Sequence, residues 1–245
     1  MESENIRLSV IIPAFNEEKR LPRTLAHVVA YLEKQDFYSE IIVVDDGSTD
    51  NTVPVVRNCR RGSIPLELLQ HSDGANHGKG ASVRRGMLAA RGAYRLFMDA
   101  DNSTTLDQVK RFWPFFEDGF DVVIGSRALR ESVIGRHQSV FKECAGRIGN
   151  FLVQTLAVPG IHDTQAGFKM FTSAAAEAIF SRQTIKRWGY DIELLAIARS
   201  LGYRIREIPI TWLNAAGSKV TAGSYVEVLG EIWRIRQNLR SGVYK

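Results

Sequence analysis

The chain has 245 residues, of which 44% are hydrophobic and 24% charged, a composition typical of an ordinary soluble globular protein. Its longest apolar stretches are far shorter than a membrane span, and its N-terminus lacks the basic and apolar regions of a signal peptide. The formal net charge of +5 favours anionic partners, which include nucleic acid, phosphorylated substrates and an anionic membrane surface. The two cysteines, Cys59 and Cys144, lack metal-ligand spacing, which indicates a reducing cytoplasm.

Short apolar runs alternate with amphipathic segments in the first half of the chain. The runs at 8–13, 40–44, 64–70 and 94–99 predict strands. Helices are predicted to begin near Leu21, at Ser48, whose side chain can cap the second one, and near Gly78. Alternation with short connections predicts an α/β fold, a mostly parallel sheet covered by helices on both faces.

The second half of the chain has a different pattern. Residues 121–125 and 203–210 predict strands, and helices are predicted over about 137–157, 190–201 and 225–239. We see no linker, repeat or low-complexity segment. The sequence therefore predicts one domain over 1–245, with a nucleotide-binding half at about 6–127. The other half, about 128–245, is expected to face the acceptor and the membrane and to form a C-terminal helical elaboration.

Acidic residues follow three of the predicted strands. Glu17 follows the first, Asp45 and Asp46 follow the second, and Asp99 and Asp101 follow the fourth. Strand ends in open α/β sheets form the ligand crevice. One acidic turn is easily a helix cap or a solvated loop, whereas three acidic turns at one sheet edge predict a nucleotide–metal site.

Asp99 and Asp101 are spaced i, i+2, so on an extended chain both carboxylates would point the same way. Two acids at the end of a buried strand are costly unless a cation neutralises them. A divalent metal that carries a diphosphate would do so, because Mg²⁺ takes carboxylate and phosphate oxygens together. The alternative is a turn from Asp101 that caps a helix beginning near Leu106.

The segment His77-Gly-Lys79-Gly stands at a predicted helix start. Exposed N–H groups and the helix dipole favour anions there, so a phosphate or base contact is one interpretation. A plain glycine-rich turn is the other. The segment does not have the glycine spacing of the phosphate loop of nucleotide triphosphatases.

Several motifs together resemble a known family over roughly residues 8–240. Those at 12–18, 44–50, 78–80 and 98–101 are similar to the ordered motifs of the inverting, nucleotide-sugar-dependent glycosyltransferases of family two. Those at 125–127, 163–169, 188–193 and 217–220 resemble the polyprenyl-phosphate branch, with the closest likeness to dolichyl-phosphate β-glucosyltransferases. The resemblance implies a Rossmann-like glycosyltransferase A fold.

The resemblance also implies a reaction, in which a hexose leaves a nucleotide-sugar donor with inversion. Asp101, and with it Asp99, would hold Mg²⁺ or Mn²⁺ on the diphosphate. The nucleoside would lie against the residues of the first two strand ends and of the segment at 77–79, with Ala100 beside the metal ligands; these donor-binding residues are Pro13, Ala14, Glu17, Asp45, Asp46, His77, Lys79, Asp99 and Ala100.

The acceptor decides how much base catalysis is needed. A sugar hydroxyl must lose a proton as it attacks, whereas a lipid monophosphate has a second pKa of about 6 and is largely ionised already. A phosphate acceptor therefore demands cations, and we expect Arg127, Arg136 and Lys219 to supply them. Asp163 is the candidate for an assisting carboxylate, with a helix cap as its alternative role.

Contact with a membrane surface is expected to be peripheral. Relatives in this branch carry membrane segments ahead of or behind the domain, and the sequence shows neither. The apolar face of 137–157 is by default a core face, but in the branch it lies at the membrane surface, and the final helix with Trp233 is a second candidate. These features predict a cytoplasmic protein on the cytoplasmic face of a membrane.

Other functions remain open on the residues alone. Within the same fold, the donor could be GDP-mannose or the acceptor a glycan. A nucleotidyltransferase would usually show a glycine-rich, basic loop after the first strand, but residues 14–18 are acidic. A basic nucleic-acid- or membrane-binding module would form a positive patch without three acidic strand ends, so we expect no nucleic-acid partner. The sequence indicates no oligomeric state.

Overall fold

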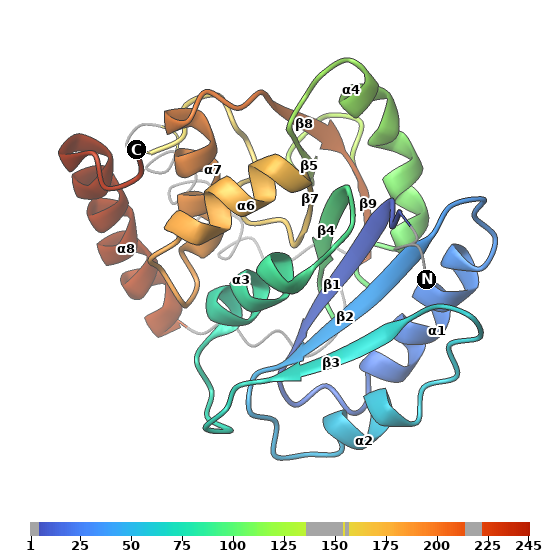
Figure 1. The fold of residues 1–245 in the computed structure, drawn as a ribbon. Helices are drawn as coiled ribbons and strands as arrows, with labels where there is room; N and C mark the ends of the chain where they lie inside the picture. The colour runs from blue at the N-terminus through green and yellow to red at the C-terminus, as the bar shows by residue number, and fades with distance from the viewer. Residues whose placement is uncertain (1–4, 136–153, 155–156, 214–221) are drawn as a thin grey trace.

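The computed structural model describes residues 5–135, 154, 157–213 and 222–245. A seven-stranded sheet in the order β3-β2-β1-β4-β7-β5-β8 forms its centre, and β6 and β9 form a separate two-stranded sheet (Figure 1). In chain order the strands are β1 Leu8–Ala14, β2 Ser39–Asp45, β3 Leu66–Gln70, β4 Tyr94–Met98, β5 Val122–Ser126, β6 Val133–Ile134, β7 Phe168–Thr172, β8 Ile205–Pro209 and β9 Thr211–Trp212.

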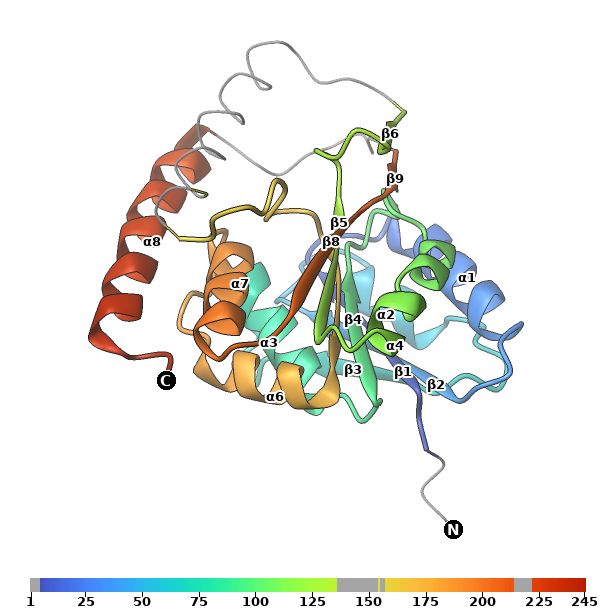
Figure 2. The same cartoon turned by 90° about the horizontal axis from the view of Figure 1, so that it is seen from above.

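Helices cover both faces of the large sheet, as the alternating pattern predicts. One face carries α3, α6 and α7, the other carries α1, α2, η1 and α4, and α8 packs outside α7 (Figures 1 and 2). Their bounds are α1 Leu21–Leu32, α2 Thr52–Arg57, α3 Lys79–Ala89, the 3₁₀ helix η1 Leu106–Arg111, α4 Trp113–Glu117, α6 Ser173–Arg182, α7 Tyr190–Ser200 and α8 Ala222–Ser241.

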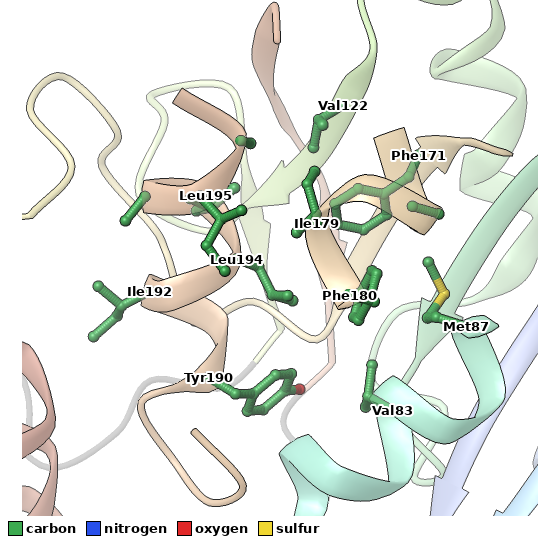
Figure 3. Packing of buried hydrophobic residues seen from close by; sticks show 14 of the residues in the cluster. Val83, Met87, Val122, Phe171, Ile179, Phe180, Tyr190, Ile192, Leu194 and Leu195 are labelled. Carbon is green, nitrogen blue, oxygen red and sulfur yellow. The ribbon is translucent and has the colours of Figure 1, made fainter. Parts of the chain in front are cut away.

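The two faces carry separate hydrophobic clusters because side chains alternate along each strand. In β1, Ile11 belongs to the cluster under α3, α6 and α7, whereas Val10 and Ile12 belong to the cluster under α1 and η1. Figure 3 shows the first cluster, in which Phe171 and Phe180 pack between the helices and the sheet. Burial on both faces explains why the strands read as continuous apolar runs.

Strand β7 is the feature of the sheet that the sequence did not predict. It lies between β4 and β5 and runs antiparallel to both, while the other neighbouring strands are parallel. The strand Phe168–Thr172 contains Lys169 as its second residue, and this buried lysine interrupts the apolar pattern on which strand prediction depends. Helix α6, which follows it directly, was also missed.

The strand predicted over 203–210 is confirmed by β8, and β9 follows it, whereas two other local predictions are wrong. Ser48 does not cap α2, which has Asn51 at its N-cap position, and its hydroxyl instead accepts from the backbone N–H of Asn16. Strand β4 ends at Met98, so Asp99 and Asp101 lie in the turn beyond the strand, and the i, i+2 argument on an extended chain does not apply.

The C-terminal elaboration is confirmed by α8, which covers the predicted helix at 225–239. The helix predicted over 137–157 lies almost entirely outside the described residues. Within the part of the chain that the structure describes, no helix has the length and apolar character needed to cross a membrane.

Candidate active site

The three acidic loops meet at one edge of the sheet because their strands are neighbours. Strand β1 pairs with β2 on one side and with β4 on the other, and all three run parallel. Their carboxyl ends therefore lie side by side. This arrangement brings the loops with Glu17, Asp45, Asp46, Asp99 and Asp101 to one carboxyl edge of the sheet, as the sequence predicts, and this is the edge at which open α/β sheets form a ligand crevice.

The loop after β1 is fixed to the loop after β2 through its backbone. Pro13 and Ala14 are buried and pair in register with Val44 and Asp45. The N–H of Glu17 donates to Thr52 Oγ1 over 2.7 Å, and its buried carboxylate forms two hydrogen bonds with Arg20, one of them from Nε at 2.6 Å. Glu17 thus orients Arg20, a residue that the sequence analysis did not select.

Asp45 and Asp46 are buried, and neither of them caps α2. Asp45 accepts from Ser48 N–H and from the side-chain amide of Gln70, both over 3.3 Å. Asp46 accepts from the backbone N–H groups of His77 and Gly78 over 2.9 and 3.0 Å. The Asp46 carboxylate therefore connects the end of β2 to the start of α3.

The close approach of these two loops requires a glycine. Gly47 has φ +75°, and a Cβ at this position would lie 2.7 Å from the carbonyl oxygen of Gly74. Beside this contact the rings of His71 and His77 lie 4.3 Å apart, and His71 Nε2 is 3.3 Å from Asp46 Oδ1. Burial and the neighbouring His77 ring lower the pKa of His71. The loop is thus held in place before any ligand arrives.

Lys79 and Asp99 form an ion pair in the centre of the crevice, with 2.5 Å between Nζ and Oδ1. Asp101 Oδ1 accepts from Ser103 N–H over 2.9 Å, and the carbonyl of Ala100 accepts from the Thr24 hydroxyl over 2.6 Å. Asp101 closes a turn but does not cap η1, whose N-cap position is Thr105. The alternative role as a helix cap is therefore wrong.

Arg127 and Asp163 form a second ion pair on the far side of β4. Arg127 donates to Asp163 from Nε over 2.7 Å, from Nη2 over 2.9 Å and from its backbone N–H over 2.9 Å. The Arg127 guanidinium also lies over the ring of Trp212. Burial acts to raise the pKa of Asp163, but Arg127 outweighs it and the pKa is lowered. Asp163 positions Arg127 and caps no helix.

A third pair, Lys169 with Asp191, lies beneath the crevice and was not predicted. Lys169 is fully buried, and its Nζ donates to Asp191 Oδ1 and to the Ala166 carbonyl, both over 2.5 Å. The neighbouring Tyr190 projects from the start of α7 toward α3 (Figure 3). Burial and the carboxylates of Asp191 and Asp99 raise the pKa of Tyr190 well above its ordinary value. The sequence feature that could have indicated this pair is Lys169 itself, a charged residue inside an otherwise apolar run.

Of the predicted site residues, Lys219 and Arg136 lie outside the described part of the chain, and His77 faces Asp73, with 2.9 Å between Nε2 and Oδ2. Within the described ranges there is no group of three or more side chains of the metal-ligating types His, Cys, Asp and Glu that could hold a metal alone. The crevice therefore offers paired charges and two carboxylates at its centre, which suits a ligand that brings its own anionic oxygens.

A family comparison identifies the class of protein. The model of glycosyl transferase family 2 matches residues 9–180, which include the three acidic strand ends and the Arg127–Asp163 pair. The chain belongs to glycosyl transferase family 2, and the protein is a glycosyltransferase.

Curated relatives match nearly the whole chain. A dolichyl-phosphate beta-glucosyltransferase from Dictyostelium discoideum is 36% identical over 99% of this chain and 77% of its own length. The proteins of the same name from Drosophila melanogaster and Homo sapiens are 38% and 36% identical, over 90% and 100% of this chain and 71% and 79% of their own lengths.

Solved structures confirm the glycosyltransferase A fold predicted from the motifs. Glucosyl-3-phosphoglycerate synthase from Mycobacterium tuberculosis, in complex with uridine diphosphate, superposes with a TM-score of 0.69 at 19% identity and covers 95% of this chain and 80% of its own. TarS from S. aureus with UDP-GlcNAc gives a TM-score of 0.60 at 22% identity, over 94% of this chain and 66% of its own. At these identities the likeness supports the fold alone.

Proposed function

We propose that the protein transfers glucose from UDP-glucose to a polyprenyl phosphate of the dolichyl type, with inversion at the anomeric carbon. The observation that carries this proposal is the match to dolichyl-phosphate beta-glucosyltransferases over almost the full chain. That match extends through the second half, where Asp163, Lys169 and Asp191 lie. The site geometry supports the same donor and acceptor classes, as follows.

A divalent cation, Mg²⁺ or Mn²⁺, fits the centre of the crevice. Asp99 and Asp101 supply hard carboxylate oxygens, and Mg²⁺ is commonly held by one or two carboxylates plus substrate phosphates. One neighbour of this fold was solved with Mn²⁺ and uridine diphosphate. When bound, such a cation would neutralise the charge that develops on the departing diphosphate.

The residues of the first two strand ends would bind the nucleoside. Asp45 and Asp46 are buried next to Pro13 and Ala14, and their carboxylates already accept hydrogen bonds from this protein. Asp46 therefore acts by shaping the loop at 76–78, so that backbone groups and His77 can face the nucleotide. Glu17 acts by orienting Arg20 toward Asp99 and Asp101, both of which contribute to the raised pKa of Arg20 after Glu17 itself.

The state of Asp163 favours a phosphate acceptor. A general base must be able to take up a proton, but the pKa of Asp163 is lowered and both of its oxygens accept from Arg127. A phosphate acceptor needs no such base, because its second pKa is about 6. Asp163 would hold Arg127 in place, and Arg127, with Lys219, would bind the acceptor phosphate.

The division into a donor half, about 6–127, and an acceptor half, about 128–245, is functional in this proposal. The halves share one sheet, because β7 and β8 of the second half pair with β4 and β5 of the first. We also propose that the protein acts as a peripheral protein on the cytoplasmic face of a membrane. Two exposed apolar side chains of α8, Leu229 and Trp233, suit an interfacial position.

A product assay tests the proposal. Purified protein would be incubated with UDP-glucose, GDP-mannose or UDP-N-acetylglucosamine and a short polyprenyl phosphate in detergent, with Mg²⁺ or Mn²⁺. We expect a hexosyl polyprenyl phosphate from UDP-glucose, detected by mass spectrometry, with β configuration by proton NMR. The matched control acceptor is the polyprenol that lacks the phosphate. Transfer to the alcohol and not to the phosphate, or faster use of GDP-mannose, would refute the assignment.

A further inference from the structure

Among the residues that the structure describes, four cation–carboxylate pairs lie at or beneath the crevice, and one of them differs from the rest. In three pairs the carboxylate side chain is no more than 9% exposed, so the acid is enclosed by the protein. In the fourth, Lys79–Asp99, the side chains are 29% and 34% exposed. The three enclosed pairs are Arg20–Glu17, Arg127–Asp163 and Lys169–Asp191.

The backbone of Lys79 is fixed although its side chain is half-buried and accessible. Lys79 is the first residue of α3, and the turn before it contains Gly78 with φ +96°. The N–H of Ala81 donates to the carbonyl of Lys186 over 3.0 Å, which ties this helix start to the segment before α7. A Cβ at Gly80 would lie 2.7 Å from Cβ of Tyr190. Motion at this point is therefore limited to the flexible lysine side chain.

Asp99 is held on its inner side. Its N–H donates to the carbonyl of Gly167 over 3.1 Å, and its carboxylate lies against the same glycine. The Lys79 ammonium thus lies 2.5 Å from Oδ1 of a carboxylate that the proposed function assigns to a divalent cation.

We propose that Lys79 is a placeholder cation, which occupies Asp99 in the donor-free protein and moves to the donor diphosphate when the metal–nucleotide complex binds. This inference rests on the proposed function and deepens it. Lys79 exchanges one anionic partner for another, so no unpaired charge is created at either stage. A partly exposed ion pair is screened by solvent more than an enclosed one, so breaking it costs less free energy than breaking any of the three enclosed pairs.

The placeholder makes metal and nucleotide binding cooperative. Without nucleotide, metal must displace Lys79 from Asp99 and leave the ammonium without its partner. With nucleotide present, the diphosphate accepts the ammonium, and the displacement no longer opposes metal binding. By linkage, each ligand must increase the affinity for the other by the same factor.

The test measures affinities and needs no sugar and no acceptor. Mn²⁺ binding would be followed by electron paramagnetic resonance with and without UDP, for the full chain and for Lys79→Met, Lys79→Arg and Lys110→Met. In Lys79→Met we expect Mn²⁺ affinity without UDP to rise by about three- to tenfold, since the competing cation is gone. UDP affinity at saturating Mn²⁺ should fall by a similar factor, so the coupling between the ligands shrinks.

The other variants separate charge from structure. Lys79→Arg keeps the cation and should retain most of the coupling, and Lys110→Met removes an exposed lysine of η1 and should change nothing. Unchanged or weaker Mn²⁺ binding by Lys79→Met without UDP would overturn the placeholder role. Absence of any UDP binding by the unaltered protein would instead count against the proposed function.

A second measurement starts from Asp99 and needs no metal. In Asp99→Asn, Lys79 loses its partner and is available to a diphosphate in the absence of metal. UDP affinity in EDTA should therefore rise by several-fold over the unaltered protein, and adding Lys79→Met should cancel the gain in a double-mutant cycle. A gain that survives in the double variant would show that Lys79 is not the group released, and would refute the inference.

Discussion

The carboxylate of Asp99 lies so close to Gly167 that a Cβ at position 167 would be 2.2 Å from Oδ2. Real Cβ atoms do not approach other heavy atoms so closely. Gly167 immediately precedes β7, the antiparallel strand beside β4. The position of β7 therefore fixes the glycine against which the Asp99 carboxylate packs. The second half of the chain thus shapes the centre of the proposed donor site.

The substitution Gly167→Ala should therefore displace Asp99 without disturbing much else. We expect the added methyl group to reduce UDP–Mn²⁺ affinity and transfer by at least about tenfold, equivalent to about 1.4 kcal/mol. The measurements are calorimetry with UDP and Mn²⁺ and the initial rate of transfer. Gly230→Ala is the control, because a Cβ at this position of α8 meets nothing within 4 Å. Equal donor affinity in Gly167→Ala and the unaltered protein would contradict the tight packing of Asp99.

Asp101→Asn should abolish metal-dependent transfer and leave the fold intact. The asparagine oxygen can still accept from Ser103 N–H, so the turn after β4 survives. Lost carboxylate charge should weaken Mn²⁺ binding in the presence of UDP by roughly tenfold to a hundredfold. Mn²⁺ titration by electron paramagnetic resonance and thermal unfolding would measure the two effects separately. Near-normal turnover in saturating Mg²⁺ and Mn²⁺ would remove Asp101 from the metal site.

The sequence predicted the parallel part of this architecture well, and the reason is physical. Strands β1, β2 and β4 are buried on both faces and read as apolar runs, and an acid lies at the end of each or within three residues after it. Because parallel strands align their carboxyl ends, a one-dimensional pattern was enough to bring Asp46 and Asp99 to one crevice.

The sequence was less informative about partners across the sheet. The Lys169–Asp191 and Arg127–Asp163 pairs join residues that are distant in the chain, and no periodicity encodes such a pairing. The strand that contains Lys169 was not predicted, because a charged residue interrupts its apolar run. Asp163 was selected as a carboxylate, but its partner could be identified only in the structure. The functional assignments of these residues stay predictions.

Asp46 offers a test of how the loop at 76–78, which we propose faces the nucleotide, is organised. Asp46→Ala removes the acceptor for two backbone N–H groups, that of Gly78, which is buried, and that of His77, which is partly buried. We expect a loss of stability of about 1–3 kcal/mol and a fall in UDP affinity. Asp46→Asn keeps one acceptor oxygen. Its stability and its UDP affinity should therefore lie between those of Asp46→Ala and those of the unaltered protein. The measurements are denaturant unfolding and calorimetry with UDP; an unchanged UDP affinity would mean that this loop does not contact the donor.

Tyr244, which follows α8, stabilises helix α7 and the segment before it. Tyr244 is buried, and its hydroxyl donates to Glu193 over 2.7 Å, while Glu193 also accepts from Thr184 and Ile185. Tyr244→Phe should therefore destabilise the protein by about 1–2 kcal/mol, because a buried carboxylate loses a donor. Tyr38→Phe is the control, since Tyr38 is 57% exposed. Equal free energies of unfolding for the two variants would contradict this account.

The Arg127–Asp163 pair gives a prediction for stability as a function of pH. The pKa of Asp163 is lowered in the folded protein, so its contribution to stability is present above the ordinary aspartate pKa of about 3.9 and is lost as the pH falls through the lowered value. Asp163→Asn should thus be less stable by about 3 kcal/mol at neutral pH. The difference should persist down to about pH 5 and shrink below about pH 4. A difference that grows on acidification would have the wrong sign.

The same pair separates a phosphate acceptor from a hydroxyl acceptor. If Arg127 binds the acceptor phosphate and Asp163 only positions it, Arg127→Ala removes a charged contact worth about 1.5–3 kcal/mol, a loss of roughly tenfold to a hundredfold in transfer. Asp163→Asn should be milder, and its fractional loss should stay constant between about pH 5 and pH 8, because Asp163 takes up no proton in that range. Slow hydrolysis of UDP-glucose by water should survive in both variants.

The control is Arg130→Ala, an exposed arginine three residues along the chain. It should leave transfer to a short polyprenyl phosphate unchanged. A hydroxyl acceptor would instead require a base that accepts its proton, so Asp163→Asn would be the more severe lesion at every pH and Arg127→Ala the milder one. Rates of transfer by the three variants across that pH range show whether Arg127→Ala or Asp163→Asn is the more severe substitution. A more severe effect of Asp163→Asn would exclude the lipid phosphate, because an acceptor that is already ionised has no proton for Asp163 to remove.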